Sequence, residues 1–227
     1  LLRSLVGFLL LFLLFVGLFI FIVPSNHRSS KITDKIRFVK KEKVTYVAIG
    51  DSLTQGVGDS SKQGGFVSVL SQALESDFNW QVTSRNYGIA GNTSNQILKR
   101  MQEKKDIKRD LKKAKMMTLT VGGNDVIHVI KDNITNLNVN TFSKPAVEYQ
   151  KRLRHIIELV RKDNKTLPIY IVGIYNPFYL NFPEMTEMQT IVDNWNQSTE
   201  DVCKEYDNVY FVPVNDCLLY TSPSPRD

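Results

Sequence analysis

From Val44 onward, short apolar runs alternate with longer amphipathic stretches, and this alternation restricts the fold more than any other feature. Ile169–Val172 is apolar at nearly every position, which is typical of a strand in a parallel sheet that helices cover on both faces. The sequence therefore predicts an α/β fold, a three-layer α/β/α sandwich with a mostly parallel five-stranded sheet and right-handed crossovers. The expected strands are 44–49, 80–87, 116–121, 168–174 and 209–214, and the expected helices are 65–76, 94–104, 143–162 and 184–206.

An uncharged segment rich in Leu and Phe precedes this pattern. Leu5–Val23 is nineteen residues long, close to the roughly 20 residues that span a bilayer. A cleaved signal peptide is the alternative, but its apolar region is usually about 7–15 residues long and ends in small residues, whereas this run ends in Phe21-Ile22-Val23-Pro24. We therefore predict a cytoplasmic stub at 1–4, a transmembrane helix at 5–23, a basic linker at 24–43 and one domain at 44–216.

The positive charge of the chain, a net +6, is concentrated in two stretches. Residues 28–43 hold seven basic and two acidic side chains directly after the apolar segment, which favours an anionic membrane or polymer surface as partner. Residues 99–115 hold nine basic and three acidic side chains, which predicts a solvated helix face. Nucleic acid is not expected as a partner, because no recognition motif accompanies the charge. The apolar residues expected to pack inward are Ile97, Leu98, Met101, Ile107, Leu111 and Ala114.

Three short blocks, each just after a predicted strand, carry the candidate chemistry. They are Gly50-Asp51-Ser52-Leu53, the segment 86–93, and Gly122-Gly123-Asn124-Asp125. Ligands of a parallel sheet collect at the carboxyl ends of its strands, so the blocks are expected to meet there. A strand that ends in Gly and presents a Ser at the next helix start exposes a nucleophile near amides that stabilise negative charge. Alternatively Ser52 is only a helix N-cap, and Asp51 is expected to cap or buttress the turn.

In this order the three blocks resemble the GDSL or SGNH family of serine esterases and lipases. The resemblance implies a flavodoxin-like SGNH hydrolase fold and hydrolysis of carboxylic esters through an acyl-Ser52 intermediate, without a cofactor. It also implies an oxyanion hole formed by the N–H of Ser52, the N–H of Gly91 and the side-chain amide of Asn124. The expected substrate is a small-molecule, lipid or acylated-glycan ester. The alternative is a non-catalytic, membrane-tethered binding domain with the same fold.

The family's remaining motif, an Asp-x-x-His near the C-terminus, is missing from this chain. His27 lies beside the apolar segment and His155 in the middle of a basic helix. His128 follows Asp125 at the right spacing but belongs to the third block, so it is expected to be a local helix residue. Without a catalytic Asp and His, the chain as given is expected to be essentially inactive.

The C-terminal residues suggest why the Asp-x-x-His motif is missing. Residues 217–227 resemble the translation of a sequencing-library adapter, so the natural sequence is expected to continue past Asp216 into the missing motif. Only Cys203 and Cys217 are present, and they imply no disulfide framework. The acidic, His and Cys positions have no ligand-like spacing, so no metal is expected.

Two indications of membrane orientation conflict. Seven basic residues after the predicted span, against Arg3 before it, would keep the domain in the cytoplasm by the positive-inside rule. The family resemblance instead implies a catalytic domain displayed outside the cell. We expect a single-pass protein of the cell membrane with its catalytic domain outside.

Overall fold

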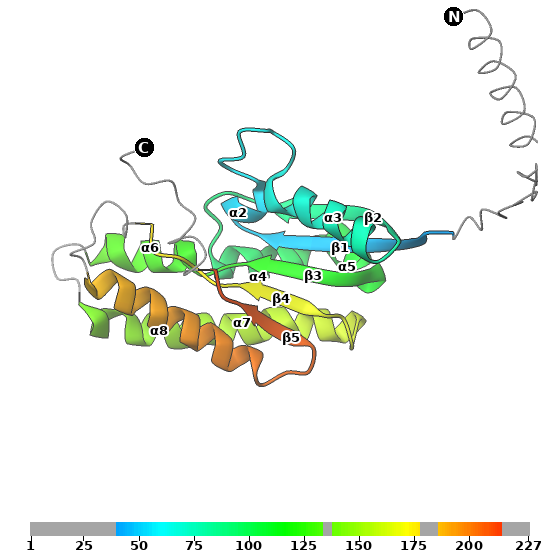
Figure 1. Cartoon of the computed structure of the whole chain (residues 1–227). Coiled ribbons are helices and arrows are strands. Elements are labelled where there is room, and N and C mark those ends of the chain that lie inside the picture. Colours follow the sequence, from blue (N-terminus) through cyan, green and yellow to red (C-terminus); the bar gives the residue numbers. More distant parts are fainter. Residues whose placement is uncertain (1–39, 134–137, 178–185, 215–227) are drawn as a thin grey trace, which may run out of the picture. The chain divides into compact units, whose positions relative to one another are not determined.

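The structure of the chain is a computed structural model that describes residues 40–133, 138–177 and 186–214 (Figure 1). The chain divides into two units, Leu1–Lys40 and Lys41–Asp227, and the following description concerns the second. Within the described ranges no helix is both long and apolar enough to cross a bilayer. The predicted span at 5–23 and the predicted tail at 217–227 lie outside the described residues.

Five strands form one sheet in the order β2-β1-β3-β4-β5, with every neighbouring pair parallel. The parallel sheet predicted from the sequence is therefore confirmed, and each strand lies within a few residues of its expected run. β1 lies between β2 and β3 and is buried from Tyr46 to Gly50, because helices cover both of its faces. The strands are β1 (Glu42–Gly50), β2 (Trp80–Gly88), β3 (Ala114–Thr120), β4 (Ile169–Val172) and β5 (Val209–Val212).

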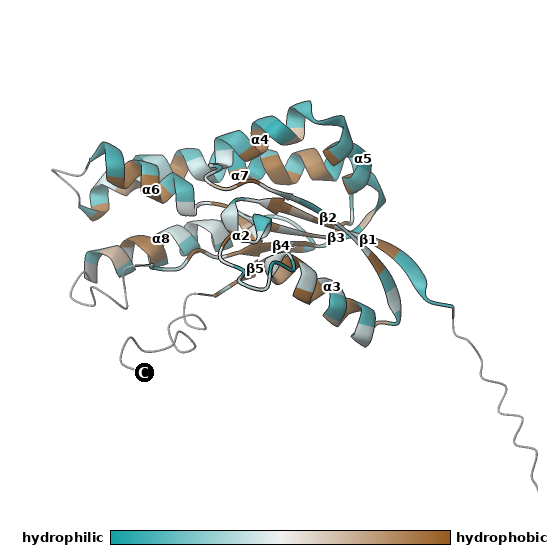
Figure 2. Cartoon of the chain, turned by 90° about the horizontal axis from the view of Figure 1, so that it is seen from above, coloured by the Kyte–Doolittle hydropathy of each residue, from teal (hydrophilic) through white to brown (hydrophobic). Residues whose placement is uncertain are grey.

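Helices cover the two faces of the sheet unequally (Figure 2). The main core lies on the face covered by α4 (Ser94–Glu103), α5 (Lys105–Lys113), α7 (Ser143–Asp163) and α8 (Thr186–Cys203). On the other face α3 (Gly65–Asp77) covers β1 and β2 over a smaller cluster around Tyr46. Between α3 and β5 this second face carries an apolar groove of about 640 Å³. The three-layer arrangement is present, with one thin layer.

The basic stretch 99–115 covers two helices rather than one. α4 ends before Lys104, whose extended backbone (φ −84°, ψ 112°) interrupts the helical hydrogen bonds, and α5 then leads directly into β3. The apolar residues predicted to point inward are all buried. Their inward direction was right. The predicted helix 94–104 corresponds to α4, whereas α5 was not among the predicted helices.

A second difference concerns the segment 126–142, for which the sequence predicts a loop apart from a local helix residue at His128. The structure places α6 at Gly123–Asp132 and a 3₁₀-helix, η1, at Val139–Phe142. Val126 and Val129 are buried on one side of α6. Their three-residue spacing is the helical signal in the sequence, and the expectation of a loop was wrong for these residues.

Candidate active site

The first block forms a tight turn between β1 and the short helix α2 (Ser52–Gln55). Asp51 is the N-cap of α2, and its Oδ1 accepts a hydrogen bond from the Leu53 N–H at 3.1 Å. Asp51 therefore caps the turn, as predicted, and Ser52 is the first helical residue rather than the cap. Gly50 is required at the strand end, since a Cβ there would lie 2.1 Å from the Thr120 hydroxyl.

Two residues that the sequence analysis did not identify hold this turn. The Thr120 hydroxyl, at the end of β3, donates to Asp51 Oδ1 at 2.7 Å and accepts from the Asp51 N–H at 3.1 Å. Arg100 of α4 donates to the carbonyl oxygens of Gly50 and Tyr87. These contacts hold the turn from the neighbouring strand and from the helix layer. In the sequence, only the position of Thr120 at a strand end could have suggested its role.

The second block packs against α2 through side-chain hydrogen bonds. Asn86 donates to the Thr54 carbonyl at 2.6 Å, and the Ala90 N–H donates to Gln55 at 2.6 Å. Gly91 is exposed and has a left-handed backbone (φ +78°), which favours glycine whatever the space around it. Among the described residues, the N–H of Gly91 has no hydrogen-bond acceptor, so it is available to a ligand.

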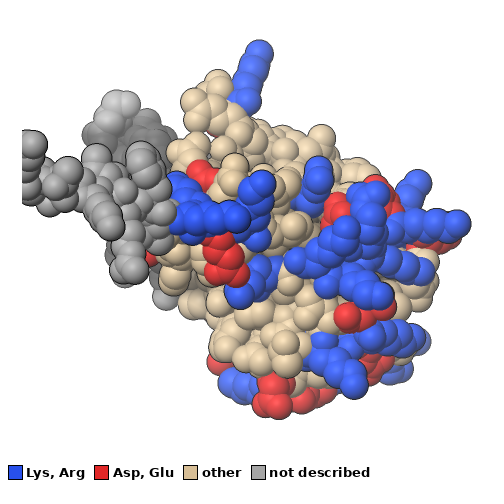
Figure 3. Space-filling model, turned by 90° about the vertical axis from the view of Figure 1, so that its right-hand side faces the viewer, with Lys and Arg blue, Asp and Glu red and all other residues tan. Residues whose placement is uncertain are grey.

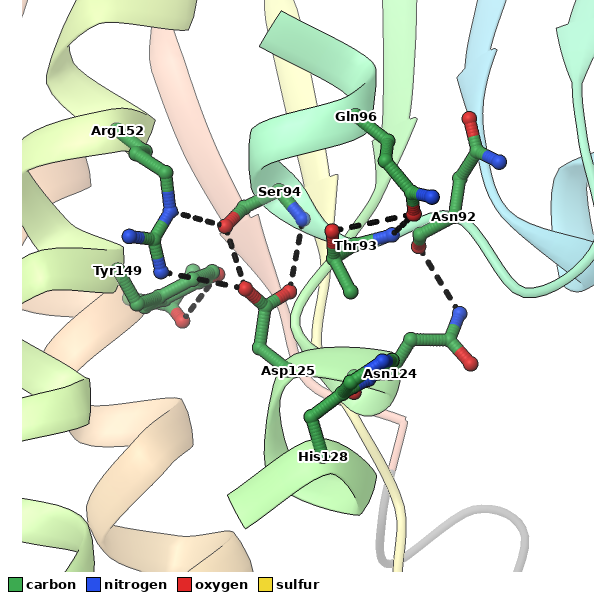
Figure 4. Close-up of polar contacts among 10 residues, drawn as sticks. Asn92, Thr93, Ser94, Gln96, Asn124, Asp125, His128, Tyr149 and Arg152 are labelled. Atoms are coloured by element: carbon green, nitrogen blue, oxygen red, sulfur yellow. Dashed lines mark hydrogen bonds and ion pairs between the residues drawn. The ribbon is translucent and has the colours of Figure 1, made fainter. Parts of the chain in front are cut away.

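The third block lies at the start of α6 and contacts the second block. Asn124 Nδ2 donates to the Asn92 carbonyl at 3.0 Å, as Figure 4 shows. An Asn amide carries two N–H groups, so this contact orients the side chain and leaves the second N–H unused. The N–H of Ser52 likewise has no acceptor within the described part of the chain. The structure thus provides three free N–H groups on the three predicted residues.

A buried polar cluster beneath these blocks joins α4, α6 and α7 (Figure 4). Asp125 accepts hydrogen bonds from the Ser94 N–H at 2.8 Å and from the Ser94 hydroxyl at 2.5 Å. Arg152 donates to the Ser94 hydroxyl at 2.7 Å and forms an ion pair with Asp125 at 3.3 Å. The cluster holds the start of α4, which follows Gly91, against the start of α6, which carries Asn124. Asp125 belongs to the third block, but nothing in the sequence pattern indicated Ser94 or Arg152.

An apolar pocket of about 190 Å³ opens beside the turn and is lined by both Ser52 and Asn124. The first and third of the three blocks therefore both reach this pocket at the carboxyl edge of the sheet. Gly91 is not among the described residues that line this pocket. The apolar walls of the pocket include Val126, Ile127, Ile130, Ile174, Met188 and Val192.

The two described histidines do not line the pocket. His128 is exposed on α6, and its Nδ1 lies 2.8 Å from the Asn124 carbonyl oxygen (Figure 4). His155 is exposed on α7. In the described parts of the chain, no cluster of three or more His, Cys, Asp or Glu side chains could hold a metal ion.

Comparison with known proteins relates this geometry to one family. The model of the GDSL-like lipase/acylhydrolase family matches residues 48–226. The chain is 32% identical over 187 residues to the uncharacterized protein YpmR of Bacillus subtilis, an alignment that covers 82% of this chain and 72% of YpmR. It is 30% identical over 138 residues to the spore germination lipase LipC of Bacillus licheniformis, covering 59% of this chain and 64% of LipC.

A solved structure has the same fold at lower sequence identity. The lipase Lip_vut3 from a goat rumen metagenome superposes with a TM-score of 0.68 at 23% identity, covering 76% of this chain and 81% of the lipase. This likeness concerns the arrangement of strands and helices.

Proposed function

The chain belongs to the GDSL-like lipase/acylhydrolase family, and from that membership we propose that it hydrolyses carboxylic esters through an acyl intermediate on Ser52. One observation carries the proposal. Ser52 and Asn124 come from segments 72 residues apart, yet they line one pocket at the carboxyl edge of the sheet. A nucleophile and an amide donor on the same pocket are what acyl transfer requires.

In the proposed reaction, Ser52 Oγ gives its proton to a base and bonds to the ester carbonyl carbon. The carbonyl electron pair moves onto oxygen, where the free N–H groups of Ser52, Gly91 and Asn124 stabilise the negative charge. The alcohol leaves with the proton as the carbon–oxygen bond breaks. Water then attacks the acyl-Ser52 ester in the same way and releases the acid. This sequence uses no cofactor.

Asn124→Ala is expected to lower kcat for p-nitrophenyl butyrate by about 10²–10³ with a smaller change in KM, since an oxyanion donor acts mainly on the transition state. The assay uses a chain that carries the Asp-x-x-His block expected after position 216. Asn124→Asp should be at least as harmful, because a carboxylate repels the developing charge. A tenfold rise in KM at unchanged kcat would instead make Asn124 a residue that binds substrate. A thermal melting curve of each variant measures how far loss of the hydrogen bond to the Asn92 carbonyl lowers the stability of the fold.

The pocket beside Ser52 supports a short acyl group as substrate. Its walls are apolar, and its volume of about 190 Å³ is below the ≈ 300–1,000 Å³ that is usual for sites of drug-sized ligands. Each methylene of an acyl chain that leaves water contributes about 0.8 kcal/mol, until the chain reaches the end of the pocket. We therefore propose acyl groups of a few carbons, in contrast to long fatty acyl chains.

Ile130→Trp tests this assignment, because Ile130 is a half-buried wall residue of the pocket. It is expected to lower kcat/KM for p-nitrophenyl octanoate by at least about tenfold relative to p-nitrophenyl acetate. Val147→Trp is the matched control, since Val147 is exposed on α7 outside this pocket. Equal effects of Ile130→Trp on both esters would mean that the acyl chain lies elsewhere.

One observation favours a second candidate function. Neither described histidine lines the pocket, and a serine nucleophile without a base is a poor attacker. The alternative is a binding domain that keeps the fold and the pocket but has no turnover. Labelling of Ser52 by a fluorophosphonate, in the chain that carries the expected Asp-x-x-His block, distinguishes the two, because only an activated serine reacts.

A further inference from the structure

A cluster of basic side chains lies on the side of the domain where β1 begins (Figure 3). We call it the basic face, and its residues are all exposed. With Glu42, Asp106 and Asp110 included, the stretches 41–43 and 104–115 carry nine basic and three acidic residues, a net +6 that equals the net charge of the whole chain. The basic face consists of Lys41, Lys43, Lys104, Lys105, Lys108, Arg109, Lys112, Lys113 and Lys115.

Most of this charge is not neutralised by neighbouring side chains. Within the described residues, the ion pairs of the basic face are Lys115 with Glu42 and Arg109 with Asp110. Asp110 is buried, also contacts Arg85, and has a pKa below its usual range because Arg109 hydrogen-bonds it. The six lysines at 41, 43, 104, 105, 112 and 113 have no ion pair with a described residue.

The form of α5 explains how the charge is displayed. Ile107, Asp110 and Leu111 are buried toward the sheet, and the opposite side of the helix presents Lys105, Arg109 and Lys112. No large apolar side chain of α5 is exposed, so this helix is suited to contact charged groups at a surface and not to insert into hydrocarbon.

An aromatic pair, with Phe78 exposed and Trp80 half-buried, lies where β2 begins. Phe78 is 58% exposed and stacks on Trp80, the first residue of β2, with ring centroids 5.0 Å apart. Trp80 is paired in register with Glu42, next to Lys41 and Lys43. Aromatic rings beside lysines are typical of surfaces that rest at the headgroup level of a membrane.

We propose that the basic face and the Phe78–Trp80 pair dock on a bilayer surface rich in anionic phospholipid headgroups. The predicted span at 5–23 would bring the domain to that surface, since the 17 residues from 24 to 40 reach at most about 60 Å when fully extended. A tether of that length keeps the local lipid concentration high. Each lysine near an anionic surface raises membrane affinity by about fivefold.

Nucleic acid is the competing partner for a basic surface. A single-stranded nucleic acid needs open aromatic faces on which bases stack, and here the exposed ring of Phe78 stacks on the half-buried ring of Trp80. Lys41 follows the predicted membrane segment 5–23 after only 17 residues, which favours lipid.

This docking would leave the candidate active site free. The basic face lies at the amino ends of β1 and β3, and Ser52 follows the carboxyl end of β1, about 26 Å away at ~3.3 Å per residue. No residue of the basic face lines the Ser52 pocket. The pocket would therefore lie well clear of the lipid surface, toward substrates that approach from solution.

The test uses the full chain in nanodiscs of phosphatidylcholine alone or with one quarter phosphatidylglycerol. Lysines are acetylated with a water-soluble reagent and quantified by mass spectrometry. In the anionic discs we expect Lys112 and Lys113 to react at least about fivefold more slowly than in neutral discs, and 0.5 M NaCl to remove the difference. Lys62 and Lys131, exposed near the opposite edge of the sheet, serve as internal controls whose rates stay unchanged.

A matched pair of variants completes the experiment. The triple variant Lys105→Gln, Lys112→Gln, Lys113→Gln should abolish the slower reaction of Lys41 and Lys43 in anionic discs, whereas Lys62→Gln, Lys131→Gln, Lys144→Gln should preserve it. Equal lysine reactivity in the two kinds of disc would overturn the proposal. Stronger protection of the same lysines by single-stranded RNA in detergent than by anionic lipid would overturn it in favour of nucleic acid.

Discussion

Ser52→Ala is expected to reduce hydrolysis of p-nitrophenyl acetate and butyrate by about 10⁴-fold or more, because loss of a triad member removes most of the acceleration in serine hydrolases. The substitution removes only the hydroxyl at the first residue of α2, where Asp51 supplies the cap. The fold should therefore remain. The rate is measured in a chain that carries the Asp-x-x-His block expected after position 216, together with a thermal melting curve.

The control for this experiment is Ser76→Ala, which removes an exposed hydroxyl from α3 outside the pocket. It should keep the full rate and its labelling by a fluorophosphonate, while Ser52→Ala loses both. Undiminished turnover by a folded Ser52→Ala protein would refute the nucleophile assignment. If the unsubstituted protein also shows neither turnover nor labelling, the result would instead favour the binding-domain alternative.

The second large effect concerns the base. The 227-residue chain is expected to hydrolyse p-nitrophenyl butyrate about 10⁴-fold more slowly than the same chain with the expected Asp-x-x-His block in place of residues 217–227. The structural reason is that His128 and His155 are exposed on α6 and α7 and neither lines the Ser52 pocket. Both chains are assayed at equal concentration after purification in detergent.

Substitution of the two histidines is the companion measurement. His128→Ala and His155→Ala should each change the slow rate of the 227-residue chain by less than about twofold. Fast hydrolysis by this chain that disappears in one of the two variants would identify that histidine as the base. It would also show that the position of the imidazole in the structure is not the one it takes with substrate bound.

Much of the fold followed from local patterns in the sequence. The continuous apolar run at Ile169–Val172 predicted a strand covered on both faces, and this strand is β4 of the parallel sheet. The extent of α6 was missed, although His128 was expected to be a helix residue and Val126 and Val129 have helical spacing. The helix α4 was predicted as 94–104, to within one residue, but α5 was not predicted, because only Ile107 and Leu111 are apolar between Lys105 and Lys113.

Part of the candidate site was also predictable. Ser52 and Asn124 were identified by their places after strands, because strand direction in a parallel sheet brings the carboxyl ends to one edge. They line one pocket, whereas Gly91 of the second block does not. Thr120, Ser94 and Arg152 were not identified, since Ser, Thr and Arg at such positions are common on any surface. The roles of Ser52, Gly91 and Asn124 in catalysis stay predictions.

By itself, then, the sequence determined the order of strands and helices, the edge at which chemistry would gather and the sign of the charge, because each depends on neighbours along the chain. The tertiary structure alone decided which distant side chains meet. Asp125 bonds Ser94 across 31 residues, and Thr45 of β1 pairs with Ala114 of β3. Such contacts depend on how helices and strands pack side by side, and packing distances of this kind leave no periodic signal in the sequence.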